Sequence, residues 1–216
     1  MLDSDTPGAI DAYEFAWNPL KEYFVDLLLV GLVWLAFAIP AGLLHHAHRG
    51  FIAAVYNLFI MVPLNFGALY AYLRAARGET PRVTDLFEAF RSAYGQSILA
   101  HGLFLVLVGL GFAMLVVPGI IVAVRLAFVA FLVVDEHMTA VSAVKESWRR
   151  TAGHGGTIFL LWLLGIPISI AGVLLLGVGI IPAVMWIHLT FATFFAAVTA
   201  SEGERVVAPA GSPAPA

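Results

Sequence analysis

The stretch that decides the fold runs from Ile98 to Val134 and reads ILAHGLFLVLVGLGFAMLVVPGIIVAVRLAFVAFLVV. It contains 37 residues, of which Arg125 alone is charged at neutral pH. An α-helix rises about 1.5 Å per residue, so this stretch is much too long for a single crossing of a hydrocarbon layer about 30 Å thick. Pro118-Gly119 is a turn signal inside it. We therefore predict two membrane-spanning helices, 98–117 and 120–134, joined by a tight turn.

Similar apolar runs lie on both sides of this stretch. Residues 25–44 and 51–73 precede it, residues 157–176 and 180–199 follow it, and Gly177-Val178-Gly179 separates the last two. Of the 216 residues, 61% are hydrophobic and 12% are charged, whereas a soluble domain carries about 25% charged residues. The sequence predicts an all-α integral membrane domain, residues 25–200, with six transmembrane helices arranged as three hairpins.

The basic residues outside the predicted spans fall almost entirely on one side of the membrane. If the N-terminus is cytoplasmic, the outer loops contain only Arg49. Short loops rich in Lys and Arg stay in the cytoplasm, so we predict that both termini are cytoplasmic. Four acidic residues precede the first basic one, unlike a cleaved signal peptide, so the first apolar run is kept. The nine inner basic residues are Lys21, Arg74, Arg77, Arg82, Arg91, Lys145, Arg149, Arg150 and Arg205.

An amphipathic segment precedes each predicted hairpin. Its apolar residues recur at spacings of three and four, which is typical of a helix with one apolar face. We predict three interfacial helices, the first within residues 1–24, and three parallel copies of one helix-plus-hairpin unit; chance similarity of flanking helices is the alternative. Residues 201–216 end in a stretch rich in Ala and Pro and are predicted to be disordered. The apolar positions are Ile10, Tyr13, Trp17, Leu20 and Phe24; Val83, Leu86, Phe87, Phe90 and Tyr94; and Met138, Val141, Val144 and Trp148.

Composition and motifs exclude several classes of function. The net charge of −3 leaves no basic surface for nucleic acid, and the absence of Cys excludes disulfides and thiolate ligands. His45, His46 and His48 form the one cluster with metal-ligand character, but no carboxylate lies on that side, so we expect surface histidines and no metal. We find no HExxH, Walker or nucleophile-elbow motif, and therefore predict no cofactor, no catalytic residue and no enzymatic activity.

Arg125 needs an explanation because an arginine inside a membrane helix costs about 2.5–3.5 kcal/mol. Asn57 and His188 are predicted at a similar depth in the outer leaflet, and Asn65 lies deeper in the second span. One hypothesis is a polar layer of Arg125, Asn57 and His188 that binds an anion or a lipid headgroup. The other is a structural arginine that reaches toward the interface and pairs with backbone carbonyls.

Small residues indicate where helices approach one another closely. Gly67, Ala71 and Ala75 lie at spacings of four on one helix face. Such ridges let backbones approach within lipid, where the hydrophobic effect does not join helices. We expect this ridge to pack inside the bundle, with a homodimer face as the alternative.

Three segments resemble a known family. Val117-Pro118-Gly119-Ile120 with Arg125 in the next helix, Val134-Asp135-Glu136, and Ala143-Val144-Lys145-Glu146-Ser147-Trp148 follow one another in that order. This pattern is similar to YciC-like bacterial membrane proteins and to the membrane domain attached to some glycerophosphoryl diester phosphodiesterases. The resemblance implies a multi-pass inner-membrane protein without an assigned reaction. The phosphodiesterase domain is missing from this chain, so that activity is not implied.

The charge distribution suggests where recognition takes place. We expect a non-catalytic protein of the bacterial cytoplasmic membrane whose inner face binds lipids or a protein partner. A small uncoupled transporter or channel with Arg125 lining its path is the alternative, and an intramembrane lipid enzyme is a more distant one. The residues expected at the inner interface are Arg74, Arg77, Arg82, Arg91, Lys145, Trp148, Arg149 and Arg150.

Overall fold

The computed structural model describes residues 7–46, 50–174 and 179–207, and every regular element in this part of the chain is helical. The elements are α1 (Ala9–Glu22), α2 (Phe24–His46), α3 (Gly50–Tyr56), the π-helix η1 (Asn57–Met61), α4 (Val62–Ala76), the 3-10 helix η2 (Val83–Phe87), α5 (Glu88–Ser92), α6 (Tyr94–Met114), α7 (Val116–Arg125), α8 (Val129–Val134), α9 (Ala140–Arg150), α10 (Gly155–Leu174) and α11 (Ile180–Val207).

Six helical segments of the described chain are long and apolar enough to cross a membrane. Each overlaps one of the six predicted spans, so the prediction of an all-α, multi-pass membrane protein is confirmed at this level. The segments are Phe24–Leu44, Gly50–Ala76, Tyr94–Met114, Val116–Val134, Gly155–Leu174 and Ile180–Glu202.

Apolar side chains cover much of the outer surface of these segments. Leu105 on α6 is 56% exposed, Leu163 on α10 is 48% exposed, and Leu29 on α2 is 46% exposed. A soluble monomer rarely exposes apolar surface on this scale. Such exposure of apolar side chains is expected for helices that are surrounded by lipid.

The turn between the third and fourth spans lies earlier than predicted. The helix breaks at Leu115, whose φ of −170° and ψ of 163° are extended, and Pro118 falls in the first turn of α7. Proline is tolerated there because the first amides of a helix have no partner within the helix. Gly111 of α6 and Gly119 of α7 face each other closely, since a Cβ atom on Gly111 would lie 2.9 Å from the Gly119 Cα. Pro118 and Gly119 therefore lie inside α7, where Gly119 allows α6 to approach closely, and the chain turns at Leu115 instead.

The last helix runs further than the expected end of the membrane domain. It extends to Val207, whereas the tail was predicted to begin at residue 201. Residues 208–216 of the predicted tail lie outside the described residues.

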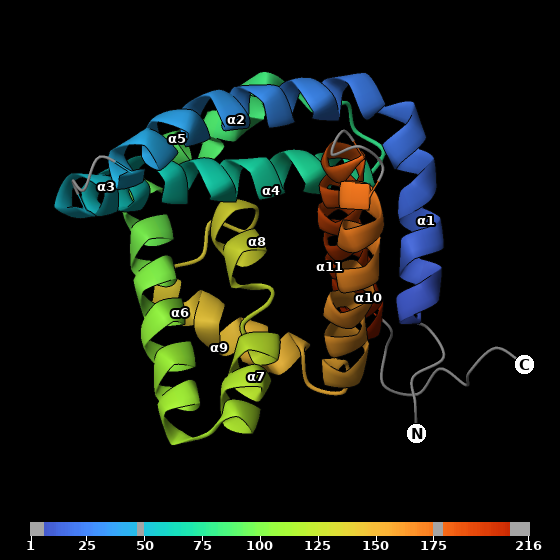
Figure 1. Ribbon diagram of the computed structural model, residues 1–216. Helices are drawn as coiled ribbons and strands as arrows, with labels where there is room; N and C mark the ends of the chain where they lie inside the picture. The colour runs from blue at the N-terminus through green and yellow to red at the C-terminus, as the bar shows by residue number, and fades with distance from the viewer. Residues whose placement is uncertain (1–6, 47–49, 175–178, 208–216) are drawn as a thin grey trace, which may run out of the picture.

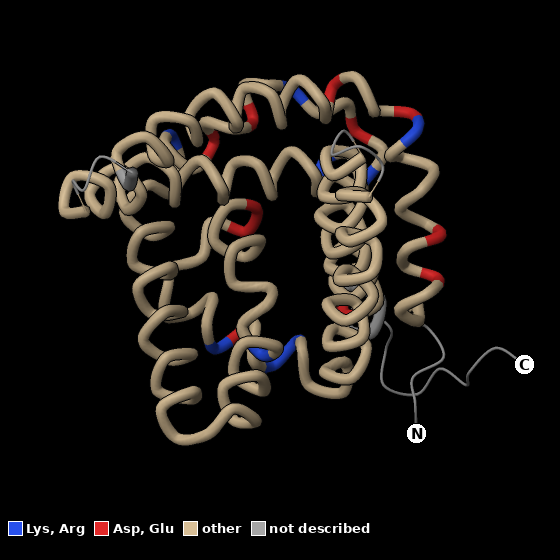
Figure 2. Tube along the Cα trace, in the orientation of Figure 1, with Lys and Arg blue, Asp and Glu red and all other residues tan. Residues whose placement is uncertain are grey.

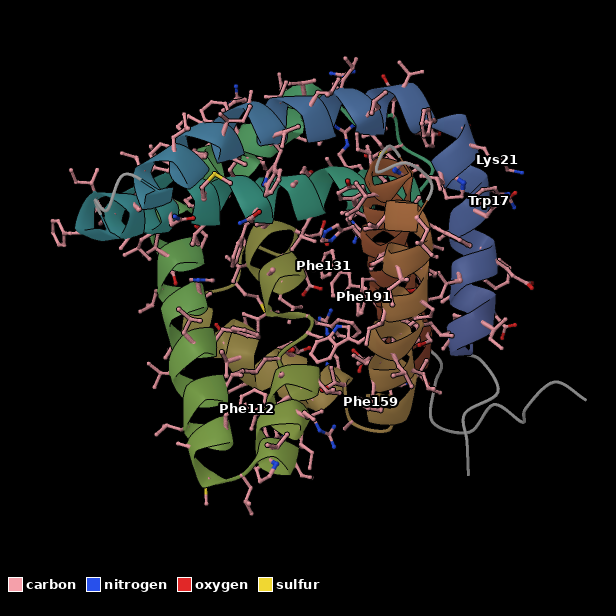
Figure 3. All side chains as sticks on the ribbon, in the orientation of Figure 1. Trp17, Lys21, Phe112, Phe131, Phe159 and Phe191 are labelled. Atoms are coloured by element: carbon pink, nitrogen blue, oxygen red, sulfur yellow. The ribbon has the colours of Figure 1, made fainter. Side chains whose placement is uncertain are left out.

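The hairpins extend in different directions (Figure 1). The pair α2 and α4 lies across the top of the view, whereas α6, α7, α10 and α11 run up and down. The connection from α6 to α7 is at the bottom, and the facing ends of α10 and α11 are at the top. In the middle, α8 packs against α11: the ring of Phe131 stacks on Phe195 with centroids 4.9 Å apart. Figure 3 shows Phe131 and Phe191 pointing into this central region.

The first helix lies along the last hairpin. The Tyr13 hydroxyl donates to the Leu161 carbonyl at 3.0 Å, and Trp186 Nε1 donates to the Tyr13 carbonyl at 3.0 Å. As a result, Lys21 and Gly179 line one cavity of about 510 Å³, although the charge distribution predicts them on opposite sides of the membrane. The predicted arrangement of three parallel hairpins is therefore not confirmed. The contacts of Tyr13 with Leu161 and Trp186 hold α1 along the last hairpin.

The predicted interfacial segments bury only part of their predicted apolar faces. Helix α1 buries Tyr13 and Leu20 together with Ala12 and Ala16, and leaves Ile10 and Trp17 exposed. The second segment is two short pieces, η2 and α5, instead of one helix. In α9 the buried face consists of Ala140, Ala143, Ser147 and Arg150, while Val141 and Trp148 point outward.

The ridge of Gly67, Ala71 and Ala75 packs within the chain. All three residues are buried, and Gly67 faces the backbone of η2. A Cβ atom on Gly67 would lie 2.0 Å from the Leu86 carbonyl oxygen. Because the obstacle is backbone, no side-chain rotation relieves the clash.

We predict that Gly67→Ala destabilises the protein by at least about 2 kcal/mol, since overpacking a tight contact typically costs 1–3 kcal/mol. The control is Gly102→Ala on α6, where a Cβ atom meets nothing within 4 Å. Thermal unfolding of the purified variants in detergent measures the difference. Equal midpoints for the two variants would contradict the close approach of α4 and η2.

Candidate functional site

A partly open cavity of about 520 Å³ lies between α2, α4 and α11. In Figure 1 the start of α11 reaches this hairpin near the end that is closer to α1. Most of its lining is aliphatic, including Leu28 and Leu32 from α2, Leu69 from α4 and Val184 from α11. The polar side chains in the lining are Trp34, Asn65, Tyr72 and His188.

The four polar side chains form two pairs. Trp34 Nε1 donates to Asn65 Oδ1 at 2.8 Å. Since an indole nitrogen only donates, this bond fixes the orientation of the amide and leaves Asn65 Nδ2 free. The rings of Tyr72 and His188 stack with centroids 5.4 Å apart and an interplanar angle of 23°. Within the described chain, no hydrogen bond joins Asn65 Nδ2, the Tyr72 hydroxyl or the His188 ring to another group.

The cavity can hold an apolar molecule by one polar end. Its walls are aliphatic, and its free donors are an amide, a phenol and an imidazole. The lining contains no Asp, Glu, Lys or Arg. Pockets of about 300–1,000 Å³ with a few convergent polar groups are typical of small-molecule sites.

The three residues of the predicted polar layer, Arg125, Asn57 and His188, make no hydrogen bond or ring contact with one another in the described chain. Asn57 Nδ2 donates to the Ala53 carbonyl one turn back along the chain at 2.9 Å. Arg125 contacts α9, and His188 lines the cavity with Asn65. The sequence allows the depth of a residue along its span to be estimated, but it does not show which helices are neighbours. Of the predicted polar residues, the structure places only His188 and Asn65 in one cavity.

Arg125 ends α7 at a break in the fourth span. Leu126 to Phe128 form a turn before α8 begins. The Ser147 hydroxyl donates to the Arg125 carbonyl at 2.7 Å and accepts from the Phe128 amide at 3.2 Å. Ser147 therefore satisfies two backbone groups that the break leaves without helical partners.

The Arg125 side chain itself lies against α9. Its guanidinium carbon is 5.8 Å from the centroid of the Trp148 ring, and its Nη1 is buried without a hydrogen-bond partner. The aromatic face compensates part of the cost of the charge. Arg125 does not line the cavity between α2, α4 and α11.

Four of the seven basic residues predicted at the inner interface form ion pairs within the chain. Arg77 holds Asp135 through two bonds of 2.6 and 2.7 Å. Arg74 pairs with Glu79 at 2.9 Å and with Asp85 at 3.0 Å. Arg149 pairs with Glu146 and Glu202, and Arg150 with Glu136, Glu146 and Glu202. In the described part of the chain, Arg82, Arg91 and Lys145 are exposed and without an acidic partner.

The ion pairs around Arg150 join α9 to α11. Arg150 is only 8% exposed and also bonds to Thr199 of α11 at 3.3 Å. Hydrogen bonds from Arg149 lower the pKa of Glu146 to about 2, so this carboxylate stays ionised at neutral pH. In Figure 2 the blue and red segments of α9 run across the view from beside α6, past α7, toward the lower end of α10. This cluster fixes α9 in place instead of presenting free charge to a partner.

The predicted weak metal candidates cannot be placed. The side chains of His45 and His46, and all of His48, lie outside the described residues. Elsewhere in the described chain, no group of three His, Asp or Glu side chains could hold a metal ion.

Sequence reasoning missed Trp34, Tyr72 and Ser147. A tryptophan and an asparagine near the middle of consecutive spans could have indicated a hydrogen bond across the first hairpin. Ser147 lies inside the segment that carries the family resemblance, but its role depends on a helix break that hydropathy does not reveal.

We predict that Ser147→Ala destabilises the protein by about 1–3 kcal/mol, because the Phe128 amide loses its partner and the Arg125 carbonyl keeps only the longer bond of 3.3 Å from the Thr151 hydroxyl. The matched control is Ser142→Ala on the same helix, whose exposed hydroxyl bonds only to Thr139. Its effect should stay within about 0.5 kcal/mol. Thermal unfolding in detergent distinguishes the two. A smaller loss for Ser147 than for Ser142 would argue against its role at the break.

Comparison of the chain with family models, with curated proteins and with solved structures finds no match. The resemblance to YciC-like proteins therefore stays a prediction.

Proposed function

We propose that this chain is a bacterial inner-membrane protein that binds a membrane lipid in the cavity between α2, α4 and α11 and catalyses no reaction. The observation that carries the proposal is the cavity itself, about 520 Å³ with aliphatic walls and with hydrogen-bonding groups that have no partner in the described chain. It opens among helices whose outer surfaces are apolar, so a lipid is the molecule most abundant at its entrance. The lining supports binding, because it is mostly aliphatic and contains no Asp, Glu, Lys or Arg.

The proposed orientation has both termini in the cytoplasm. It is supported by the nine basic residues on one side of the predicted spans against Arg49 on the other. On the inner side, the exposed Arg82, Arg91 and Lys145 are free to contact anionic headgroups, each contributing about 1 kcal/mol near a charged membrane surface. The outward Trp148 suits the same headgroup region.

This orientation predicts the labelling pattern of single cysteines in a chain that has none of its own. Thr80→Cys and Ala152→Cys, both at exposed positions, should react with a membrane-impermeant maleimide only after the cells are opened. Phe51→Cys, 83% exposed in the native chain, should react in intact cells. Labelling of Thr80→Cys in intact cells would overturn the orientation.

Lipid binding is tested by filling the cavity. Gly31 lines it, and a Cβ atom there meets nothing within 4 Å, so Gly31→Leu adds a side chain to the cavity without a backbone clash. Gly42→Leu is the control, because Gly42 lies on the same helix in equally open space but outside the lining. We expect the native chain and Gly42→Leu to retain one lipid through purification in mild detergent.

Gly31→Leu should retain about tenfold less lipid, as expected from an overpacking cost near 1.4 kcal/mol. Native mass spectrometry counts the bound lipids. Equal retention by the two leucine variants, or no retained lipid in any of the three proteins, would count against the proposed function.

A further inference from the structure

We infer that the lipid in this cavity is uncharged and belongs to the diacylglycerol class, with a carbonyl oxygen that accepts a hydrogen bond from Asn65. The inference rests on the proposed function and specifies its ligand. Three features of the cavity lead to it: the lack of charge in the lining, the supply of free donors, and the position of the polar groups along their helices.

The lack of charge excludes a phosphate in the cavity. Its fifteen lining residues include no Lys or Arg. A buried phosphate without a cationic partner would keep its full desolvation cost. Arg125, the one arginine of the fourth span, is held against Trp148 and lies outside the lining. The bound head must therefore be neutral.

The free groups match a head that combines carbonyl and hydroxyl oxygens. Asn65 Oδ1 is occupied by Trp34, which leaves two N–H donors on Nδ2. An ester carbonyl is an acceptor and fits this amide. The His188 ring offers one donor and one acceptor, and the Tyr72 hydroxyl offers both, so either can pair with the free hydroxyl of a diacylglycerol. A pure hydrocarbon would leave all three groups unpaired.

The polar groups lie near the middle of their spans. Trp34 is the eleventh residue of the 21-residue segment Phe24–Leu44, about 15 Å along it at 1.5 Å per residue. Asn65 is the sixteenth residue of Gly50–Ala76 and His188 is the ninth residue of Ile180–Glu202, so each lies well inside its segment. A phospholipid keeps its charged head at the surface of a hydrocarbon layer about 30 Å thick. A neutral lipid can bring its head to this depth, because no charge has to leave the interface.

The experiment compares three lipids that share their chains. The full chain in dodecyl maltoside is titrated with dioleoylglycerol, with dioleoylphosphatidate, which adds a phosphate, and with the dioleyl ether of glycerol, which lacks the carbonyls. Native mass spectrometry reports the bound fraction. We expect dioleoylglycerol to bind at least about tenfold more tightly than phosphatidate and about fivefold to tenfold more tightly than the ether.

Two variants test the residues. Asn65→Leu removes the amide and should lower the affinity for dioleoylglycerol to that for the ether. His188→Phe keeps a ring beside Tyr72 but loses both nitrogens, and we expect an affinity about fivefold lower. Circular dichroism shows whether each variant is folded. If one is not, the comparison of the three lipids on the native chain still decides the question.

The outcomes separate the two proposals. If no lipid binds the native chain better than it binds Gly31→Leu, the proposed function itself fails. If all three lipids bind equally and Gly31→Leu loses all of them, lipid binding stands and the neutral head is wrong. Tighter binding of phosphatidate also overturns the inference.

Discussion

Within a hydrocarbon layer every backbone amide and carbonyl needs a partner in the protein, because no water is present to supply one. This constraint accounts for the helical structure of the described chain and for the special role of α9. Where the fourth span breaks after Arg125, one hydroxyl, that of Ser147, bonds to the Arg125 carbonyl and the Phe128 amide. The break is stable because a helix from the polar part of the chain packs against it. The position of α9 follows from this requirement.

The same constraint explains why α9 buries two polar side chains beside Ala140 and Ala143. Ser147 and Arg150 are buried, and Val141 and Trp148 are exposed. In a soluble protein the apolar face of an amphipathic helix faces the core. Here the interior offers backbone groups to Ser147 and carboxylates to Arg150, while the outward face of α9 carries Lys145 and Arg149 as well as the two apolar side chains. Four of the six arginines predicted to meet a partner instead form ion pairs with acidic residues of the chain, which holds the connecting segments together.

The sequence was sufficient to locate the six apolar segments, because hydropathy and length depend on one helix at a time. It was insufficient wherever a second helix decides the outcome. The turn falls at Leu115 because Gly111 and Gly119 bring α6 and α7 together. No residue near position 115 distinguishes a turn there from a turn at Pro118. Likewise, α1 lies along α10 and α11 through Tyr13 and Trp186, residues 173 positions apart. Of the candidate site, His188 and Asn65 could be selected as polar residues in apolar helices, but their common cavity depends on how α4 meets α11.

Two groups of polar residues lie in the apolar helices, and their surroundings differ. Arg125 lies at a structural joint, with its carbonyl paired to α9 and its side chain against Trp148. Asn65, Tyr72 and His188 face a cavity and keep hydrogen-bonding capacity that no described group uses. Unpaired polar groups in an apolar cavity cost free energy unless a ligand or water completes them. A protein built only for rigidity would pack leucine at these three positions, so their polarity favours a bound molecule there over one at Arg125.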